Sequence, residues 1–176
     1  FAFERLYITS PVSSEWAKGK IYFDKLQAVY NKEHVELKYT DVAPNYWAFS
    51  AIERLNTLGL IKGYVDGTFK PMNEITRGEA AMILSREMQV EVTGVIHYDD
   101  VAKNYYAYDA IQEVAAAGII TGRVAGKFNP DSPLSRAEMA TIMVRMYNLT
   151  GTTTTSFSDV PKKHWAHDSI NTLYKN

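Results

Sequence analysis

Two arginine and glutamate pairs are the residues in this sequence best placed to do chemistry. Arg77 is followed two positions later by Glu79, and Arg136 by Glu138. Both arginines stand at the first position of an expected helix, where the helix dipole disfavours a cation by about 0.3 to 1 kcal/mol. Beside free helical N–H groups, however, a guanidinium is well suited to hold an anion, and its fork matches a carboxylate. The pairs therefore predict a binding site for an anionic group.

Helix capping is the structural alternative for the same positions. Thr76 with Glu79, and Ser135 with Glu138, fit a capping box, in which the hydroxyl and the carboxylate each satisfy a backbone N–H group. Capping explains the hydroxyl and the carboxylate but not the arginine. A glutamate two positions on can offset the cost of the arginine by pairing with it. A purely structural account of these positions therefore stays open.

Both pairs belong to a repeat with a step of 59 residues and no insertion or deletion. The repeat predicts a first copy over 39–97, a second over 98–156 that ends in a Thr-rich linker, and an incomplete third over 157–176. Aromatic and glycine positions recur at this step, and they are Trp47, Tyr106 and Trp165; Gly63 and Gly122; and Phe69 and Phe128.

Each copy predicts two helices joined by a loop. Ile52 and Leu55 lie at helical spacing, and Gly59 occupies a position that commonly ends a helix. The Gly- and Pro-rich stretch that follows is typical of a loop, held by an inward-facing Phe69. A second apolar stripe begins after Thr76. One such unit is too small to bury its apolar faces alone, so we predict an all-α protein whose copies pack on one another.

Residues 1–38 do not fit the repeat, although they carry helical periodicity. At the same step of 59 they overlay the second helix of a copy, so we expect this N-terminal segment to take that helix's place in the bundle. The opening residues lack the order of a signal peptide. We therefore expect the chain to be either mature or an excised fragment.

The composition excludes several classes of function. The chain has 176 residues, a net charge of -1 and no cysteine. Near-neutrality argues against general capture of nucleic acid, and the absence of cysteine removes disulfides and thiolate metal sites. No apolar run approaches the ~20 residues that span a bilayer. No nucleophile elbow, phosphate loop or convincing metal-ligand spacing is present, so we predict a non-enzymatic protein without a cofactor or metal.

The repeat resembles the S-layer homology (SLH) domain family. The likeness rests on "YTDV", "YDDV" and "FSDV" at the starts of the copies, and on Thr76-Arg77-Gly78-Glu79 and Ser135-Arg136-Ala137-Glu138. The family signature is Thr-Arg-Ala-Glu, so each copy departs from it by one residue. The resemblance covers residues 39–176. It implies a three-pronged, pseudo-threefold arrangement of repeats around a shared helical bundle. It also implies an extracellular protein held non-covalently on the bacterial cell wall.

The ligand that the resemblance implies is a secondary cell wall polysaccharide carrying ketal-linked pyruvate, or a peptidoglycan-linked glycan. Arg77 and Arg136 would then meet the carboxylate, with Glu79 and Glu138 orienting them. Further candidates are aromatic rings that face sugar, glycines that allow close backbone approach and lysines at the groove rim, and they are Trp47, Tyr106, Trp165, Gly63, Gly122, Lys62 and Lys127.

Structural alternatives apply to these further candidates, because the aromatic rings would otherwise be core and the lysines plain solvated side chains. The alternative function is a protein–protein interaction scaffold in surface-layer assembly, with self-association and no glycan. A further rival is an enzyme whose active site lies in residues 1–38 or outside the given sequence.

Overall fold

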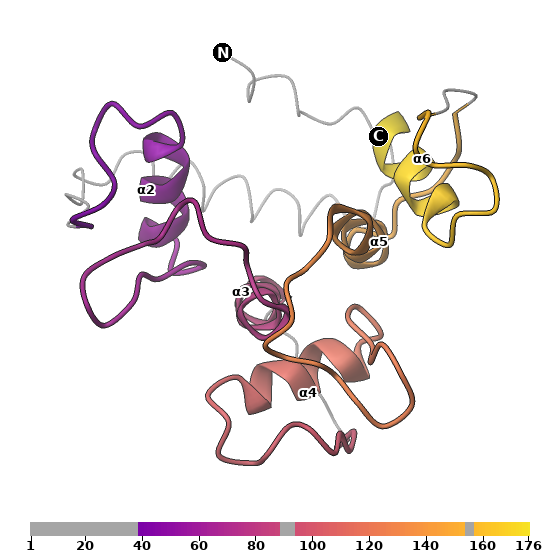
Figure 1. The fold of residues 1–176 in the computed structure, drawn as a ribbon, viewed down its shortest axis with the longest axis horizontal. Coiled ribbons are helices and arrows are strands. Elements are labelled where there is room, and N and C mark those ends of the chain that lie inside the picture. Colours follow the sequence, from indigo (N-terminus) through magenta and orange to yellow (C-terminus); the bar gives the residue numbers. More distant parts are fainter. Residues whose placement is uncertain (1–38, 89–93, 154–156) are drawn as a thin grey trace, which may run out of the picture.

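The computed structural model describes residues 39–88, 94–153 and 157–176. Over these ranges the chain forms five helices, drawn in Figure 1, and they are α2 (Phe49–Thr57), α3 (Arg77–Met88), α4 (Tyr108–Ala116), α5 (Arg136–Met146) and α6 (His167–Lys175). Extended pairing in the same ranges is limited to isolated bridges. The predicted all-α class is confirmed. None of these helices is long and apolar enough to cross a membrane. The predictions for residues 1–38 lie outside the described residues.

The helices follow the 59-residue repeat. α2 and α3 belong to the first copy, α4 and α5 to the second, and α6 to the third. The first helix of each complete copy ends at a glycine in the left-handed region, Gly59 with φ 74° and Gly118 with φ 70°. A side chain is strained in that conformation, whereas glycine adopts it freely. The predicted helix ends are therefore confirmed.

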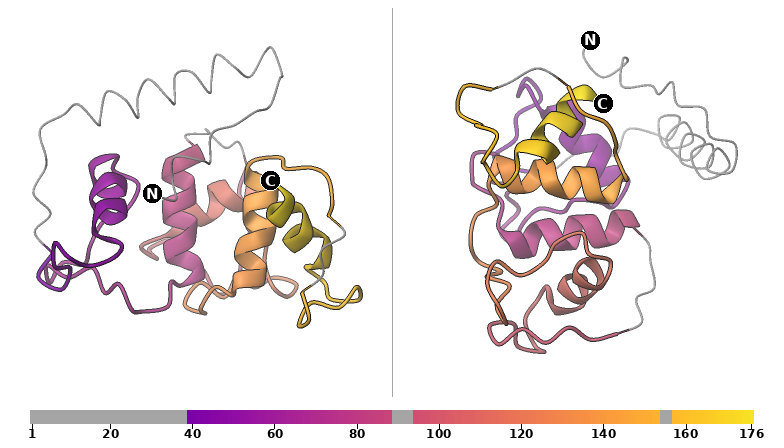
Figure 2. Two further views of the ribbon diagram at one scale, coloured as in Figure 1. Left: turned by 90° about the horizontal axis from the view of Figure 1, so that it is seen from above. Right: turned by 90° about the vertical axis from the view of Figure 1, so that its right-hand side faces the viewer.

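The first helices of the second and third copies pack on the second helix of the preceding copy. α4 contacts α3, and α6 contacts α5. In Figures 1 and 2, α3 and α5 lie side by side in the middle of the molecule, while α2, α4 and α6 lie around them. The copies thus pack on one another through neighbouring helices. The threefold bundle stays a prediction, because the segment expected to complete it lies outside the described residues.

The main core joins the first two copies. It combines Ala81 and Leu84 of α3 with Val114 of α4 and Ile142 of α5, around the fully buried ring of Phe128. A smaller cluster of Val42, Ile52 and Ile61 lies under α2.

α2 buries less than its sequence predicts. Leu55 is 38% exposed, and Ile52 is the one buried residue of α2. Among the described residues, no second helix of a preceding copy lies against α2 as α3 lies against α4. Leu55 is therefore partly exposed although it lies at helical spacing with the buried Ile52.

Aspartate side chains hold the loops between the helices. Asp41 accepts hydrogen bonds from the backbone N–H groups of Phe69 and Lys70 at 2.8 and 2.7 Å. Asp100 does the same for Phe128 and its successor at 2.9 and 2.8 Å. These bonds fix the loop so that its aromatic ring enters the core. The repeated aspartate is therefore a loop cap.

Candidate functional site

Both predicted capping boxes are present. Thr76 N donates to Glu79 Oε2 at 2.8 Å, and Glu79 N donates to the Thr76 hydroxyl at 3.2 Å. Ser135 and Glu138 make the matching pair of bonds at 2.9 and 3.2 Å. The structural alternative therefore accounts for the hydroxyl and the carboxylate in both copies. The arginines need a separate explanation.

The first N–H groups of α3 are not available to an anion. Arg77 N donates to Ser132 O at 3.0 Å, and Gly78 N donates to Pro130 O at 2.8 Å. Both acceptors belong to the loop of the second copy, which runs along the start of α3. The expectation of free helical N–H groups beside Arg77 is therefore wrong. A backbone segment 50 or more residues later in the chain satisfies them, and local sequence does not reveal it.

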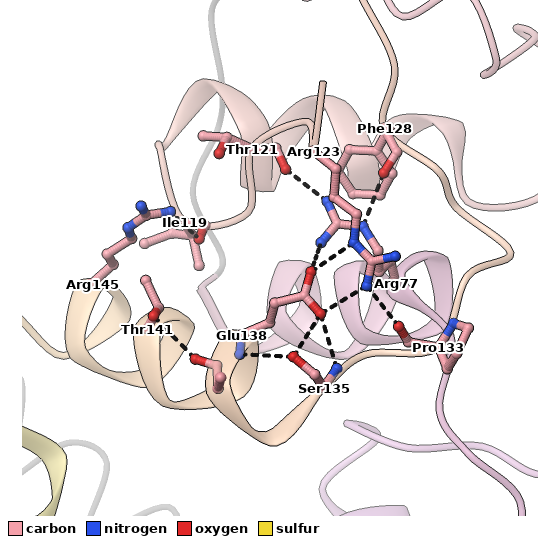
Figure 3. A network of polar contacts seen from close by, with 11 residues as sticks. Arg77, Ile119, Thr121, Arg123, Phe128, Pro133, Ser135, Glu138, Thr141 and Arg145 are labelled. Carbon is pink, nitrogen blue, oxygen red and sulfur yellow. Dashed lines mark hydrogen bonds and ion pairs between the residues drawn. The ribbon is translucent and has the colours of Figure 1, made fainter. Parts of the chain in front are cut away.

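The Arg77 side chain is directed into the second copy. It is 3% exposed. Nε donates to Phe128 O at 2.9 Å, Nη2 to Thr121 O at 2.7 Å and Nη1 to Glu138 Oε1 at 3.0 Å. The guanidinium carbon also lies 4.8 Å from the centre of the Phe128 ring. Burial lowers the pKa of Arg77, and the Glu138 carboxylate opposes that shift. Arg77 thus joins two copies and leaves little surface for a ligand (Figure 3).

Glu138 is the centre of this network. Besides Arg77, it binds Arg123, whose Nε and Nη2 donate to the two carboxylate oxygens at 2.8 Å each. The hydrogen bonds from Arg123 are the main reason that the pKa of Glu138 is lowered to about 2. Glu138 was expected to orient Arg136 of its own copy. It orients instead Arg77 of the preceding copy, because packing brings α3 and the start of α5 together.

The equivalent carboxylate of the first copy has different partners. The hydroxyl of Tyr64 donates to Glu79 Oε1 at 2.6 Å, and this bond is the main reason that the pKa of Tyr64 is raised to about 12. Lys70 lies 4.1 Å from the centre of the Tyr64 ring. Burial alone would raise the pKa of Glu79, but hydrogen bonds from Thr76 and Tyr64 outweigh it and lower the pKa. No guanidinium among the described residues pairs with Glu79.

Arg136 differs sharply from Arg77. Its side chain is exposed, and it makes no hydrogen bond or ion pair with any residue in the described ranges. Within the described ranges Arg136 is exposed, whereas Arg77 is buried.

The three repeated aromatic residues are exposed. Trp47 is 87% exposed, Tyr106 60% and Trp165 64%. The alternative that these rings are core is therefore wrong. Each ring lies beside the ring that precedes it, with centroid distances of 5.8, 4.5 and 5.7 Å along the chain. Lys62 and Lys127 are exposed as well. A contact of any of these side chains with sugar stays a prediction.

The repeated glycines accommodate the chain itself. A Cβ on Gly122 would lie 2.5 Å from Lys127 O and 3.0 Å from the Tyr98 ring. A Cβ on Gly63 would meet the Tyr39 ring and a loop carbonyl. Glycine is therefore required at both positions because the copy's own aromatic ring and loop approach so closely. Whether a ligand also approaches there stays a prediction.

Sequence reasoning missed Arg123 and Tyr64, which occupy one repeat position. Tyr64 of the first copy and Arg123 of the second are 59 residues apart, so aligning the two copies shows a tyrosine opposite an arginine in an otherwise similar loop. That difference is the only local signal. It does not reveal that both side chains bind the capping glutamate of their own copy.

Comparison with known proteins finds three family matches along the chain. Residues 38–81, 97–140 and 156–176 match the S-layer homology domain. The chain is 33% identical over 132 residues to a surface-layer 125 kDa protein of Lysinibacillus sphaericus, covering 74% of the chain and 11% of that protein. It is 33% identical over 141 residues to an S-layer protein of Bacillus licheniformis, covering 77% and 16%.

A relative named for an enzyme shares the same region. The chain is 37% identical over 141 residues to an uncharacterized cell wall amidase of Bacillus anthracis, covering 77% of the chain and 26% of that protein. The aligned region spans about a tenth to a quarter of these three relatives. The region that matches this chain is thus a small portion of each of these three relatives.

Proposed function

Because the chain belongs to the S-layer homology domain family, and is therefore a cell-surface module associated with the cell wall, we propose that it anchors its parent protein by binding a wall glycan. The proposed ligand is a secondary cell wall polysaccharide bearing ketal-linked pyruvate. The proposed binding surfaces lie between neighbouring copies. The attachment is non-covalent, and the module itself is not catalytic.

The observation that carries this proposal is an exposed aromatic ring at a boundary between copies. Tyr106 of the second copy is 60% exposed. Its hydroxyl lies 3.4 Å from the position that a Cβ on Gly78 would take, at the start of α3 in the first copy. At the same helix start, the Tyr64 hydroxyl donates a hydrogen bond to Glu79. An exposed ring beside polar groups suits a sugar, which presents an apolar face and hydroxyl edges.

The carboxylate of the proposed ligand needs a cation that it can reach. Arg136 is exposed at the start of α5, where the positive end of the helix dipole favours a bound anion. Its guanidinium can offer two parallel N–H donors to a carboxylate. Arg77 then has a positioning role, because it holds the two copies against each other.

Several copies on one chain suit a ligand that repeats. When one copy holds a polymer, a second copy meets the next sugar unit at high effective concentration. Individually weak surfaces can therefore give firm attachment. Relatives named as a surface-layer protein and as a cell wall amidase both match this module, which is what a common wall anchor would produce.

An interaction scaffold without glycan binding is the second candidate. The internal pairing of Arg77 with Glu138 favours it, because that arginine serves a salt bridge between copies. Under this reading the exposed rings would contact protein, including a second copy of the chain.

Co-sedimentation with purified cell walls separates the two candidates. We expect the chain to sediment with intact walls and to remain in solution when the secondary polymer has been extracted. Arg136→Gln should weaken sedimentation, whereas Lys162→Gln, at an exposed lysine outside the proposed site, should not. Equal sedimentation with extracted walls would contradict the proposal and would favour peptidoglycan or protein as the partner.

A further inference from the structure

The network of Arg77, Arg123 and Glu138 carries an excess of positive charge. Two guanidinium groups share one carboxylate, which leaves one positive charge uncompensated. Arg77 is 3% exposed, whereas the Arg123 side chain is 35% exposed. The uncompensated charge is therefore accessible to solvent at Arg123. Figure 3 shows the Arg123 guanidinium beside Glu138 and Pro133.

Arg123 is held in one orientation. Its Nε and Nη2 donate to the two oxygens of Glu138 at 2.8 Å each, and Nη2 also donates to Pro133 O at 2.9 Å. Nη1 makes no hydrogen bond to any residue that the structure describes. Hydrogen bonding to Glu138 raises the pKa of Arg123, so the group stays charged. A flexible arginine loses side-chain entropy when it binds a ligand, and fixing it in advance reduces that cost.

The first copy presents a different charge at the same place. Tyr64 replaces the guanidinium, and its hydroxyl donates to Glu79. The pKa of Tyr64 is raised to about 12, so the ring stays neutral. The Tyr64 and Glu79 pair is therefore negative, and Lys70 approaches it over the ring face. The arginine network of the second copy is positive by comparison.

We propose that Arg123 makes the second copy selective for an anionic sugar, because its unpaired Nη1 edge binds a carboxylate that the first copy's Tyr64 cannot bind. The inference rests on the proposed wall-glycan function and assigns the two copies different ligand units. The second copy takes the charged unit, and the surface beside Tyr64 takes sugar hydroxyls with no requirement for charge.

Exchange of the two side chains tests this assignment. The probe is a monosaccharide with a pyruvyl ketal, used as the free acid and as its neutral methyl ester, with calorimetry as the readout. We expect the wild-type chain to bind the acid about tenfold more tightly than the ester, as a charge-assisted hydrogen bond predicts. Arg123→Tyr should reduce this preference to the part that Arg136 supplies, and it keeps a hydroxyl donor to Glu138 as in the first copy. Tyr64→Arg should strengthen the preference.

A second measurement does not depend on the variants. In the wild-type chain, the Nε–H resonance of Arg123 should shift on titration with the acid and stay unchanged with the ester. A wild-type chain that binds neither probe would overturn the proposed function and this inference together. Binding of the acid with an unmoved Arg123 resonance, or with full preference retained in Arg123→Tyr, would overturn the inference alone.

Discussion

Replacing Glu138 by glutamine should destabilise the fold far more than the same change at Glu79. Glutamine at this position still reaches the N-cap backbone, so the capping box survives and the change isolates the charge. Glu138→Gln leaves Arg77 buried, at 3% exposure, without a carboxylate. Removing one partner of a buried ion pair costs about 3 to 5 kcal/mol. At Glu79 the partner is the neutral Tyr64 hydroxyl, and we expect a loss of about 1 kcal/mol or less.

The lowered pKa of Glu138, caused mainly by hydrogen bonding from Arg123, gives a stabilisation of similar size. Each factor of ten in proton affinity is worth about 1.36 kcal/mol. A pKa lowered from 4.5 to about 2 therefore corresponds to about 3 kcal/mol of stabilisation at neutral pH. The Glu138 side chain is 15% exposed, so solvent reduces this value only in part.

Urea denaturation at pH 7, followed by circular dichroism, measures the loss in both variants. Glu138→Gln should lower the free energy of unfolding by about 3 kcal/mol, with Glu79→Gln as the matched control. If the two variants lose the same stability to within about 0.5 kcal/mol, the buried network does not hold the copies together. The arginine of the first copy would then have to be explained by ligand binding alone.

Further predictions concern pH, packing and binding. In the wild-type chain, Glu138 should contribute fully to the free energy of unfolding above about pH 4.5. That contribution should be lost as the pH falls toward 2, because the pKa of Glu138 is lower in the folded than in the unfolded state. Glu138→Gln should flatten this pH dependence in acid denaturation. Gly122→Ala should cost about 1 to 3 kcal/mol in urea denaturation, since its Cβ would lie 2.5 Å from Lys127 O. Trp47→Ala should change stability by less than about 0.5 kcal/mol at 87% exposure and should weaken sedimentation with walls; unchanged sedimentation would remove Trp47 from the binding surface.

Local features of this chain were predictable because their causes are local. Capping boxes join residues three positions apart, and Gly59 ends α2 through its own backbone angle. Ile52 is buried as its helical spacing predicts. In each case the physical cause lies within one turn of helix or one loop, where the periodicity of the sequence is informative.

The role of Arg77 was not predictable in the same way. Its three acceptors lie 44 to 61 residues later in the chain. The helix dipole disfavours an arginine at this position. A bound anion or a carboxylate from a second copy would offset that cost equally well. Only the packing of the copies decides between them. For Trp47 the error runs the other way. A large aromatic at a helix start is usually buried, but this ring is exposed.

Titration of the chain with purified wall polymer, native and after removal of its pyruvyl groups, tests the central claim most directly. We expect removal of pyruvate to weaken the apparent affinity at least about tenfold, because each occupied site loses one charge-assisted hydrogen bond. Equal affinity for the two polymers would contradict recognition of a carboxylate.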